Sequence, residues 1–347
     1  MIILDDISRM FEVKKIQTNF REECMDTNKI VARALIAMAL LSPRSFGQES
    51  AKKADVSPME AVLRLHLSNR ESLASLYYSA CCRDRAVELQ ESVRDFIAFY
   101  KDKLGVASPI TVAVLDENDW DRIKQQMPDY RFPYGMPNFQ VSPSGYVLFI
   151  PADDKGVVTQ HLLGDRQHAT EASLKLFASA HLTYDEAVRR AILQLAYHEA
   201  GHTRVYEYGI QPPNLWLNEI LANYLAFAYG KARDPQTAAV TEGFVKMGIE
   251  IPAGAYTSLD DFDAHFGNIE PANYDWYQMQ FATRALEIYN EQGLGFVAKV
   301  RSVFPKGASK SKMSVAETLS QLEAISPGFQ AWAKTLGESR SEFGPLH

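Results

Sequence analysis

Two histidines four residues apart, His198 and His202, constrain this 347-residue chain more than any other feature. On an α-helix, side chains at positions i and i+4 lie one turn apart on the same face, so both imidazole rings can bind one metal ion. Glu199, beside the first histidine, lies near such an ion without having to coordinate it. Two nitrogen ligands, an open position for water and a carboxylate that accepts a proton are what metal-assisted hydrolysis requires.

The residues that precede this His-Glu-Ala-Gly-His motif predict that it is helical. Thr183 and Glu186 form a capping-box pattern, and apolar residues then recur at helical spacing without an intervening proline or glycine. We expect the helix to run to about Tyr206 or Tyr208. Gly201, inside the helix, costs about 1 kcal/mol relative to alanine, and crowding at a site explains that cost better than packing alone.

A second helix is predicted from its N-cap, Asn214, to Gly230. It is apolar nearly all round, which indicates burial, and Glu219 is the ionisable group within its apolar part. An ionised carboxylate in such a helix is costly unless it is paired or bound to a metal, so Glu219 is the candidate third ligand. The alternative is a glutamate on an exposed stripe of the helix. Asn223 lies one turn further along and could orient a metal-bound histidine.

The two helices resemble those of the gluzincin metallopeptidases, which include thermolysin, the aminopeptidase N group and the peptidase MA-like proteins. The resemblance lies in the His-Glu-x-x-His motif and in Trp-x-Asn-Glu-x-x-Ala-x-Tyr, which here covers residues 216–224. It implies a zinc ion with three protein ligands: His198, His202 and Glu219. It also implies that Glu199 is the general base and acid. Asn223 departs from the aspartate of thermolysin-type enzymes, so an amide contact replaces the carboxylate-histidine contact.

Outside the motif the resemblance is looser and covers roughly residues 90–300. A helix over 91–104 and strands over 110–115 and 146–150 are predicted from apolar spacing and β-branched runs. Residues 134–139 are expected to form a tight loop, and the alternative is a contact with the substrate. The loop lacks the glutamate that binds a free amine in aminopeptidase N-like enzymes, so no exopeptidase role is transferred. The order of these elements resembles the N-terminal half of a zincin. We therefore expect an α+β, zincin-like, two-lobed metallopeptidase domain with a mixed-sheet N-lobe and a helical C-lobe.

Attack of water on a carbonyl needs a donor that stabilises the developing oxyanion. Tyr277 is the first candidate, because the resemblance implies a tyrosine at the start of a helix that faces the zinc. Tyr274, one turn earlier, and His265 are the alternatives. Each of the three could instead be an ordinary packed residue.

The chain is expected to divide into a leader at 1–47, a helical segment at 48–90, a gluzincin-like catalytic domain at 91–335 and a polar tail at 336–347. Within the leader, residues 25–47 have a charged start, a short apolar core and small residues before a cleavage point, which is typical of a signal peptide. The alternative is an amphipathic helix. A signal peptide would make the protein secreted or periplasmic, and without one it would be cytoplasmic.

The adjacent cysteines Cys81 and Cys82 are expected to be free and buried, because neighbouring cysteines bridge each other only with backbone strain. We place them in a helical stretch that runs from Pro58 to Leu104.

The composition narrows the class of partner. A formal net charge of -7 without a basic run argues against a nucleic-acid partner. No apolar stretch reaches the ~18 residues that a membrane span needs, so no integral membrane segment is expected in the mature protein. The function that the His-Glu-x-x-His motif and the gluzincin resemblance imply is hydrolysis of a peptide or protein substrate by a zinc-dependent metallopeptidase. The alternative is a catalytically inactive zincin-fold protein that binds peptides or regulates a partner.

Overall fold

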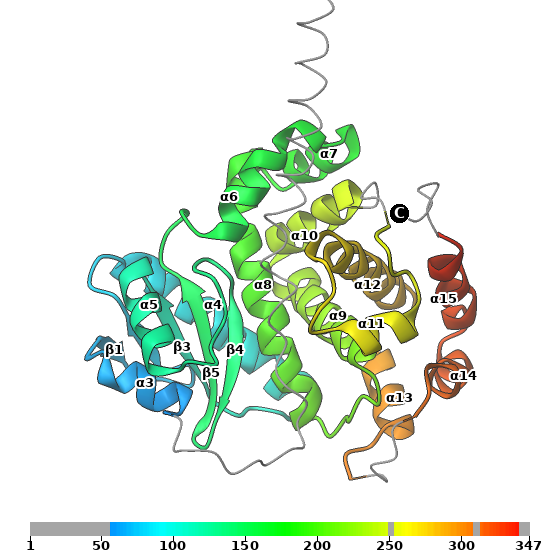
Figure 1. The fold of residues 1–347 in the computed structure, drawn as a ribbon, viewed down its shortest axis with the longest axis horizontal. Helices are drawn as coiled ribbons and strands as arrows, with labels where there is room; N and C mark the ends of the chain where they lie inside the picture. Colours follow the sequence, from blue (N-terminus) through cyan, green and yellow to red (C-terminus); the bar gives the residue numbers. More distant parts are fainter. Residues whose placement is uncertain (1–55, 249–252, 308–312, 340–347) are drawn as a thin grey trace, which may run out of the picture.

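The computed structural model describes residues 56–248, 253–307 and 313–339. The expected leader at 1–47, with its signal sequence, lies outside the described residues, as does most of the expected polar tail. Helices predominate and a small sheet lies at one end of the molecule (Figure 1). The predicted α+β class is therefore confirmed.

The sheet is mixed and has five strands in the order β1-β2-β3-β5-β4. The two central pairs, β2–β3 and β3–β5, are parallel, whereas the two outer pairs are antiparallel. The strands span Ser68–Arg70 (β1), Leu76–Tyr78 (β2), Ile110–Leu115 (β3), Asn138–Ser142 (β4) and Gly145–Pro151 (β5). The predicted strand at 110–115 is β3, and the one predicted at 146–150 is β5. Strand β4 lies at the edge of the sheet.

Three helices accompany the sheet, and the long helix α8 separates it from a larger helical part (Figure 1). The helices beside the sheet are α3 (Pro58–Arg64), α4 (Arg83–Leu104) and α5 (Glu117–Gln126). Then follow α6 (Val157–Gly164), the 3-10 helix η1 (Asp165–His168), α7 (Glu171–Ser179), α8 (Tyr184–Glu207), α9 (Leu215–Arg233) and α10 (Pro235–Gly248). The last are α11 (Leu259–His265), α12 (Pro271–Gln292), α13 (Gly295–Val303), α14 (Val315–Ile325) and α15 (Phe329–Glu338).

Helix α8 begins where the sequence predicts. Thr183 is its N-cap and forms a capping box with Glu186, and the chain leaves the helix at Tyr208. Gly201 allows α8 to cross α9 closely, because a Cβ atom there would lie 2.9 Å from the backbone oxygen of Ala222. The expectation that Gly201 reflects crowding at a site is therefore corrected, since the crowding comes from helix–helix packing.

Helix α9 is buried on every side, as its composition predicts. Asn214 is its N-cap residue but does not cap it with its side chain. Instead the Asp263 carboxylate of α11 accepts the N–H groups of Leu215 and Trp216, at 3.0 and 3.3 Å. The helix also runs past Gly230, where the sequence predicts its end.

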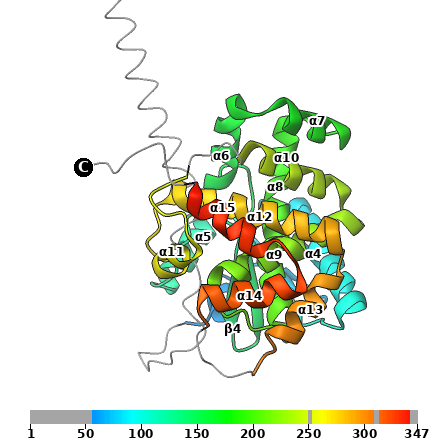
Figure 2. The same cartoon turned by 90° about the vertical axis from the view of Figure 1, so that its right-hand side faces the viewer.

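The C-terminal helices pack on α9 and α12 (Figure 2). The Trp332 ring of α15 lies 6.3 Å from the ring of Trp216 on α9 and 6.3 Å from that of Phe281 on α12. These aromatic contacts join helix α15 to α9, the helix that carries Glu219. Helix α9 is thus held between α8 on one side and α12 and α15 on the other.

Two predictions for the segment before α4 are wrong. Residues 68–70 and 76–78, within the expected helical segment, are strands of the sheet. They are only three residues long, too short for the alternation that marks a strand in sequence. Cys81 and Cys82 are joined by a disulfide bond rather than free. They lie in the turn between β2 and α4, outside any helix, and Cys81 is exposed.

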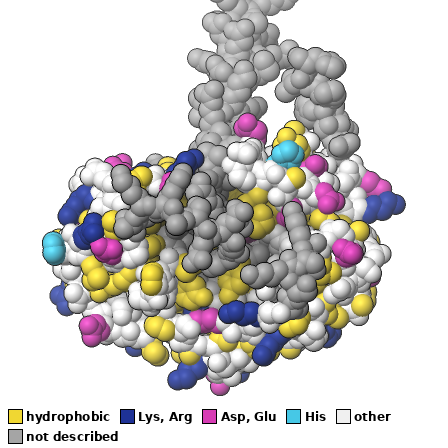
Figure 3. Space-filling model, turned by 60° about the horizontal axis from the view of Figure 1, so that its bottom comes forward, with side chains coloured by type: hydrophobic (Ala, Val, Ile, Leu, Met, Phe, Trp, Pro, Cys, Tyr) yellow, Lys and Arg dark blue, Asp and Glu magenta, His cyan; other side chains and the backbone are white. Residues whose placement is uncertain are grey.

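Charged side chains of both signs are interspersed with hydrophobic ones over the face of the described residues drawn in Figure 3. Within the described part of the chain, none of the helices combines the length and the apolar character needed to cross a membrane.

Candidate metal centre

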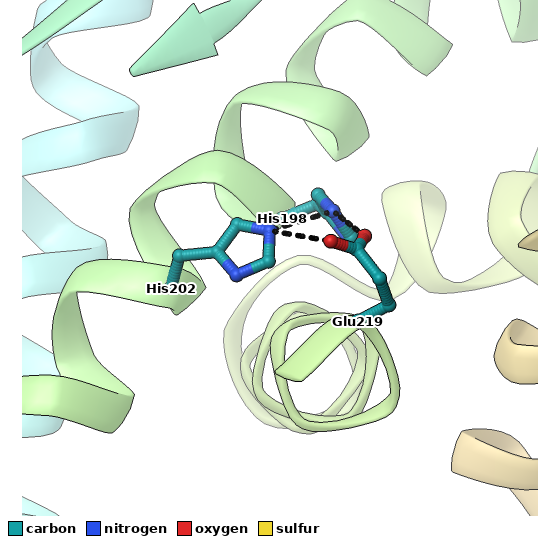
Figure 4. A group of neighbouring side chains, drawn as sticks. All are labelled: His198, His202 and Glu219. Atoms are coloured by element: carbon teal, nitrogen blue, oxygen red, sulfur yellow. Dashed lines mark hydrogen bonds and ion pairs between the residues drawn. The ribbon is translucent and has the colours of Figure 1, made fainter. Parts of the chain in front are cut away.

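The crossing of α8 and α9 brings His198, His202 and Glu219 together (Figure 4). The Nε2 atom of His198 lies 3.2 Å from Nε2 of His202 and 3.3 Å from a carboxylate oxygen of Glu219. His202 Nε2 lies 3.8 Å from the other carboxylate oxygen. All three residues are buried, and one ligand atom from each lies within 4.8 Å of the other two. Across residues 56–248, 253–307 and 313–339, no other histidine, cysteine, aspartate or glutamate joins this group.

Asn223 fixes which nitrogen of His198 carries the proton. The Asn223 amide donates from Nδ2 to the backbone oxygen of Glu219, at 3.1 Å, which can only accept. Its Oδ1 atom therefore faces His198 Nδ1, at 3.1 Å, and must accept a hydrogen bond from it. The lone pair of a neutral His198 is then on Nε2, directed toward His202 and Glu219.

This tautomer makes the group suitable for a cation. Two imidazole nitrogens and a carboxylate converge on one point, where their lone pairs repel each other unless a positive charge lies between them. A shared proton could satisfy one pair of these atoms, whereas a metal ion can bind all three. A buried His-His-carboxylate set with no fourth protein ligand among the described residues can hold a metal ion and leave a coordination position open.

The electrostatics of two of the three ligands favour metal binding. Burial raises the pKa of Glu219, but His202 and His198 outweigh it and lower the pKa to about 2. Burial lowers the pKa of His202 to about 4, against the charge of Glu219. Glu219 and His202 are therefore held in the carboxylate and neutral forms that bind metals. For His198, burial opposes the attraction of Glu219, which prevails and raises the pKa.

Gln278 of α12 completes the surroundings of the ligand carboxylate. Its Nε2 donates to Glu219 Oε2 at 3.0 Å, and its Oε1 lies 3.5 Å from Asn223 Nδ2. Gln278 thus orients both Glu219, a candidate ligand, and Asn223, which orients His198. Gln278 was not identified as a site residue from the sequence. Its position one turn after Tyr274, on the same helix face, was the pattern that could have indicated it.

Glu199 lies between the metal group and the edge of the sheet. Its Oε2 accepts the backbone N–H of Phe139, on β4, at 3.3 Å. Burial raises its pKa to about 7, with His198 opposing and Glu219 adding to that shift. A carboxyl group with a pKa near 7 can both take up and release a proton at neutral pH.

The structure places Tyr274, rather than Tyr277, beside the metal group and Glu199. Tyr274 lines the pocket at His198 and Glu199. Burial raises the pKa of Tyr274 well above its usual range, and the charges of Glu219 and Glu199 raise it further. Its hydroxyl therefore lies within the field of both carboxylates.

The other two oxyanion candidates are turned elsewhere. Tyr277 is fully buried, donates its hydroxyl to the backbone oxygen of Ser258 at 2.7 Å, and lies 5.0 Å from the Phe262 ring. His265 stacks on Tyr256, with 4.3 Å between the ring centres. Neither residue lines the pocket, so the expectation that Tyr277 faces the metal group is wrong. The rotation of α12 over α9 turns Tyr277 toward α11.

A pocket of about 800 Å³, including the solvent at its mouth, opens beside His198 and Glu199. Met136 and Pro137 of the loop before β4 form part of its lining, and α8, α10 and α12 supply the rest, together with Asn223 of α9. The loop is held by Gly135, whose Cα packs against Gly156 with no room for a side chain. The expected tight loop is therefore present, and it also borders the pocket.

Compared with protein-family models, curated proteins and solved structures, the chain has no significant match in any of the three sets. The assignment of this site therefore rests on the chain's own residues and their geometry.

Proposed function

We propose that the protein is a zinc-dependent metallopeptidase of the gluzincin type. The observation that carries the proposal is the buried convergence of His198, His202 and Glu219. A second carboxyl group, that of Glu199, lies beside them without being a ligand. A purely structural zinc site is normally closed by four protein ligands and has no use for that adjacent carboxyl. An open three-ligand site with a proton acceptor is the arrangement of hydrolytic zinc enzymes.

A zinc ion held by these ligands would supply Lewis acidity, which activates water and polarises the scissile carbonyl. Glu199 accepts the proton of the attacking water on its carboxylate and passes it to the leaving nitrogen. The Phe139 N–H fixes the orientation of that carboxylate. Tyr274 donates a hydrogen bond from its hydroxyl to the developing oxyanion. Its raised pKa keeps the hydroxyl protonated, as a donor must be.

The edge strand β4 offers the place for the peptide. Its partner in the sheet is β5, and Phe139 on β4 contacts Glu199. An extended substrate that adds to this edge would pass the metal group with its backbone hydrogen-bonded to the strand. We also propose that the sheet with α3 to α5 and the helices from α9 onward are the two lobes of a zincin-like domain, with α8 between them.

Metal removal tests this function. We expect the zinc-loaded protein to hydrolyse members of an internally quenched peptide library, and 1,10-phenanthroline to abolish that hydrolysis because the ion supplies the Lewis acid. Stoichiometric zinc should restore it, whereas magnesium should not, since magnesium prefers an all-oxygen ligand set. Fluorescence of the library, read against zinc content, gives the result. A zinc-loaded protein without activity on any peptide would reject the peptidase assignment.

Tyr274 and Tyr277 give a matched pair of variants on one helix. We expect Tyr274→Phe to lower kcat about 100-fold with little change in KM, because an oxyanion donor acts in the transition state. Tyr277→Phe should leave kcat within about threefold, since its hydroxyl bonds Ser258 away from the pocket. Steady-state kinetics on one quenched peptide separates the two. A larger loss of kcat in Tyr277→Phe than in Tyr274→Phe would make Tyr277 the oxyanion donor instead.

A further inference from the structure

The pocket beside Glu199 has apolar walls that extend away from the metal group between α8, α10 and α12. The apolar residues are Leu195, Val240, Phe244, Val245, Met279 and Ala282. A peptide bound at the metal group would have one side chain next to this pocket, because His198 and Glu199 are part of its lining. The pocket is therefore placed to choose the residue that flanks the scissile bond.

Asp275 lines this apolar pocket without a partner. The residue is 2% exposed, and no hydrogen-bond donor among the described residues reaches its Oδ2 atom. Burial raises the pKa of Asp275 well above its usual range, and the negative charge of Asp165 adds to that effect. Asp165 itself is paired with His161 at 2.8 Å. A buried carboxyl without a partner destabilises the fold, which points to a role outside folding.

Apart from His198, which belongs to the metal group, the lining supplies no basic side chain for this carboxyl. The described residues around the pocket include no lysine or arginine, and the polar ones outside the metal group and its neighbours are Gln194, Thr241 and Gln278. Gln278 already donates to Glu219. The group that would complete the pocket is therefore a cation that arrives with the substrate.

We propose that Asp275 is a specificity-determining residue that receives a lysine or arginine side chain of the substrate, next to the bond that is cleaved. This inference rests on the proposed peptidase function. The apolar walls suit the methylene stem of a basic side chain, and the carboxylate suits its charged end. The pair would form in a buried site, where a charge-assisted hydrogen bond discriminates strongly against a neutral side chain.

Two quenched peptides that differ only in arginine or citrulline test the preference, because citrulline is the neutral isostere of arginine. Cleavage sites in a peptide library, read by mass spectrometry, fix where that residue is placed. We expect the zinc-loaded wild type to prefer arginine by about 100-fold in kcat/KM. Asp275→Asn should reduce the ratio to about threefold or less, while the citrulline peptide is cleaved at a similar rate by both proteins. An unchanged ratio in Asp275→Asn would overturn the proposal.

A binding experiment keeps the pocket testable if no peptide is cleaved. Calorimetric titration with n-butylguanidine and its neutral isostere n-butylurea should show binding of the guanidine alone, weakened at least tenfold in Asp275→Asn. Asp275→Ser is the second variant, and both should melt no lower than the wild type because no hydrogen bond to Oδ2 is lost. Equal binding of the urea would overturn the proposal. So would guanidine binding that survives Asp275→Asn but is lost in Glu199→Gln, since the cation would then lie at the metal group.

Discussion

Glu199→Gln is expected to lower kcat/KM for peptide hydrolysis about 1,000-fold or more while leaving one zinc ion bound per chain. The amide cannot accept the proton of the attacking water, which removes general base catalysis. It can still accept the Phe139 N–H that now bonds Glu199, so the surroundings of the side chain should stay in place. Because Glu199 is not a ligand, zinc binding should not depend on its charge.

The measurement is hydrolysis of a quenched peptide by zinc-loaded wild type and variant, with zinc content determined on the same samples. The matched control is Glu291→Gln, which removes an exposed carboxylate from α12, far along the helix from Tyr274. It should retain full activity. Activity of Glu199→Gln near that of the wild type would exclude Glu199 as the base.

Removal of a ligand should lower zinc affinity itself, whereas Glu199→Gln should leave it unchanged. We expect His202→Ala and Glu219→Ala each to weaken zinc binding by more than about 100-fold, since even residues that only orient a ligand contribute 10- to 100-fold. Glu219→Ala should have the further effect of removing the carboxylate that pairs with both His198 and His202. Competition with a chromophoric chelator gives the affinity of each protein.

Glu291→Ala serves here as the control for loss of a carboxylate at the surface. Thermal melting of each variant shows whether the fold is retained, because helix α9 is buried from Trp216 to Gly230. Zinc affinity unchanged in both ligand variants, with the fold intact, would contradict the three-ligand site.

The features that the sequence predicted are local ones. The capping box at Thr183 sets the start of α8, and the spacing of His198 and His202 within that helix makes them neighbours. Glu219 was identifiable because an ionisable group inside an otherwise apolar helix must be paired or bound. Asn223 followed from its position one turn beyond Glu219, and it contacts His198 as expected.

The features that the sequence did not predict depend on how elements pack. Tyr274 and Tyr277 both lie near the start of α12, and the rotation of that helix over α9 decides which one reaches the pocket. That rotation also buries Asp275 in the pocket and brings Gln278 to Glu219. The cap of α9 comes from Asp263, nearly 50 residues along the chain from the helix that it caps. Apart from the one-turn spacing of Tyr274 and Gln278, these contacts leave no periodic trace in the sequence.

The proposed function depends on one zinc ion bound among His198, His202 and Glu219. The most direct test is an anomalous difference map, calculated from crystals of zinc-loaded protein with data on either side of the zinc absorption edge. We expect one peak about 2 Å from Nε2 of each histidine and from a carboxylate oxygen of Glu219, with solvent or substrate in the remaining position. A peak elsewhere, no peak in a folded protein, or a site closed by a fourth protein ligand would contradict it.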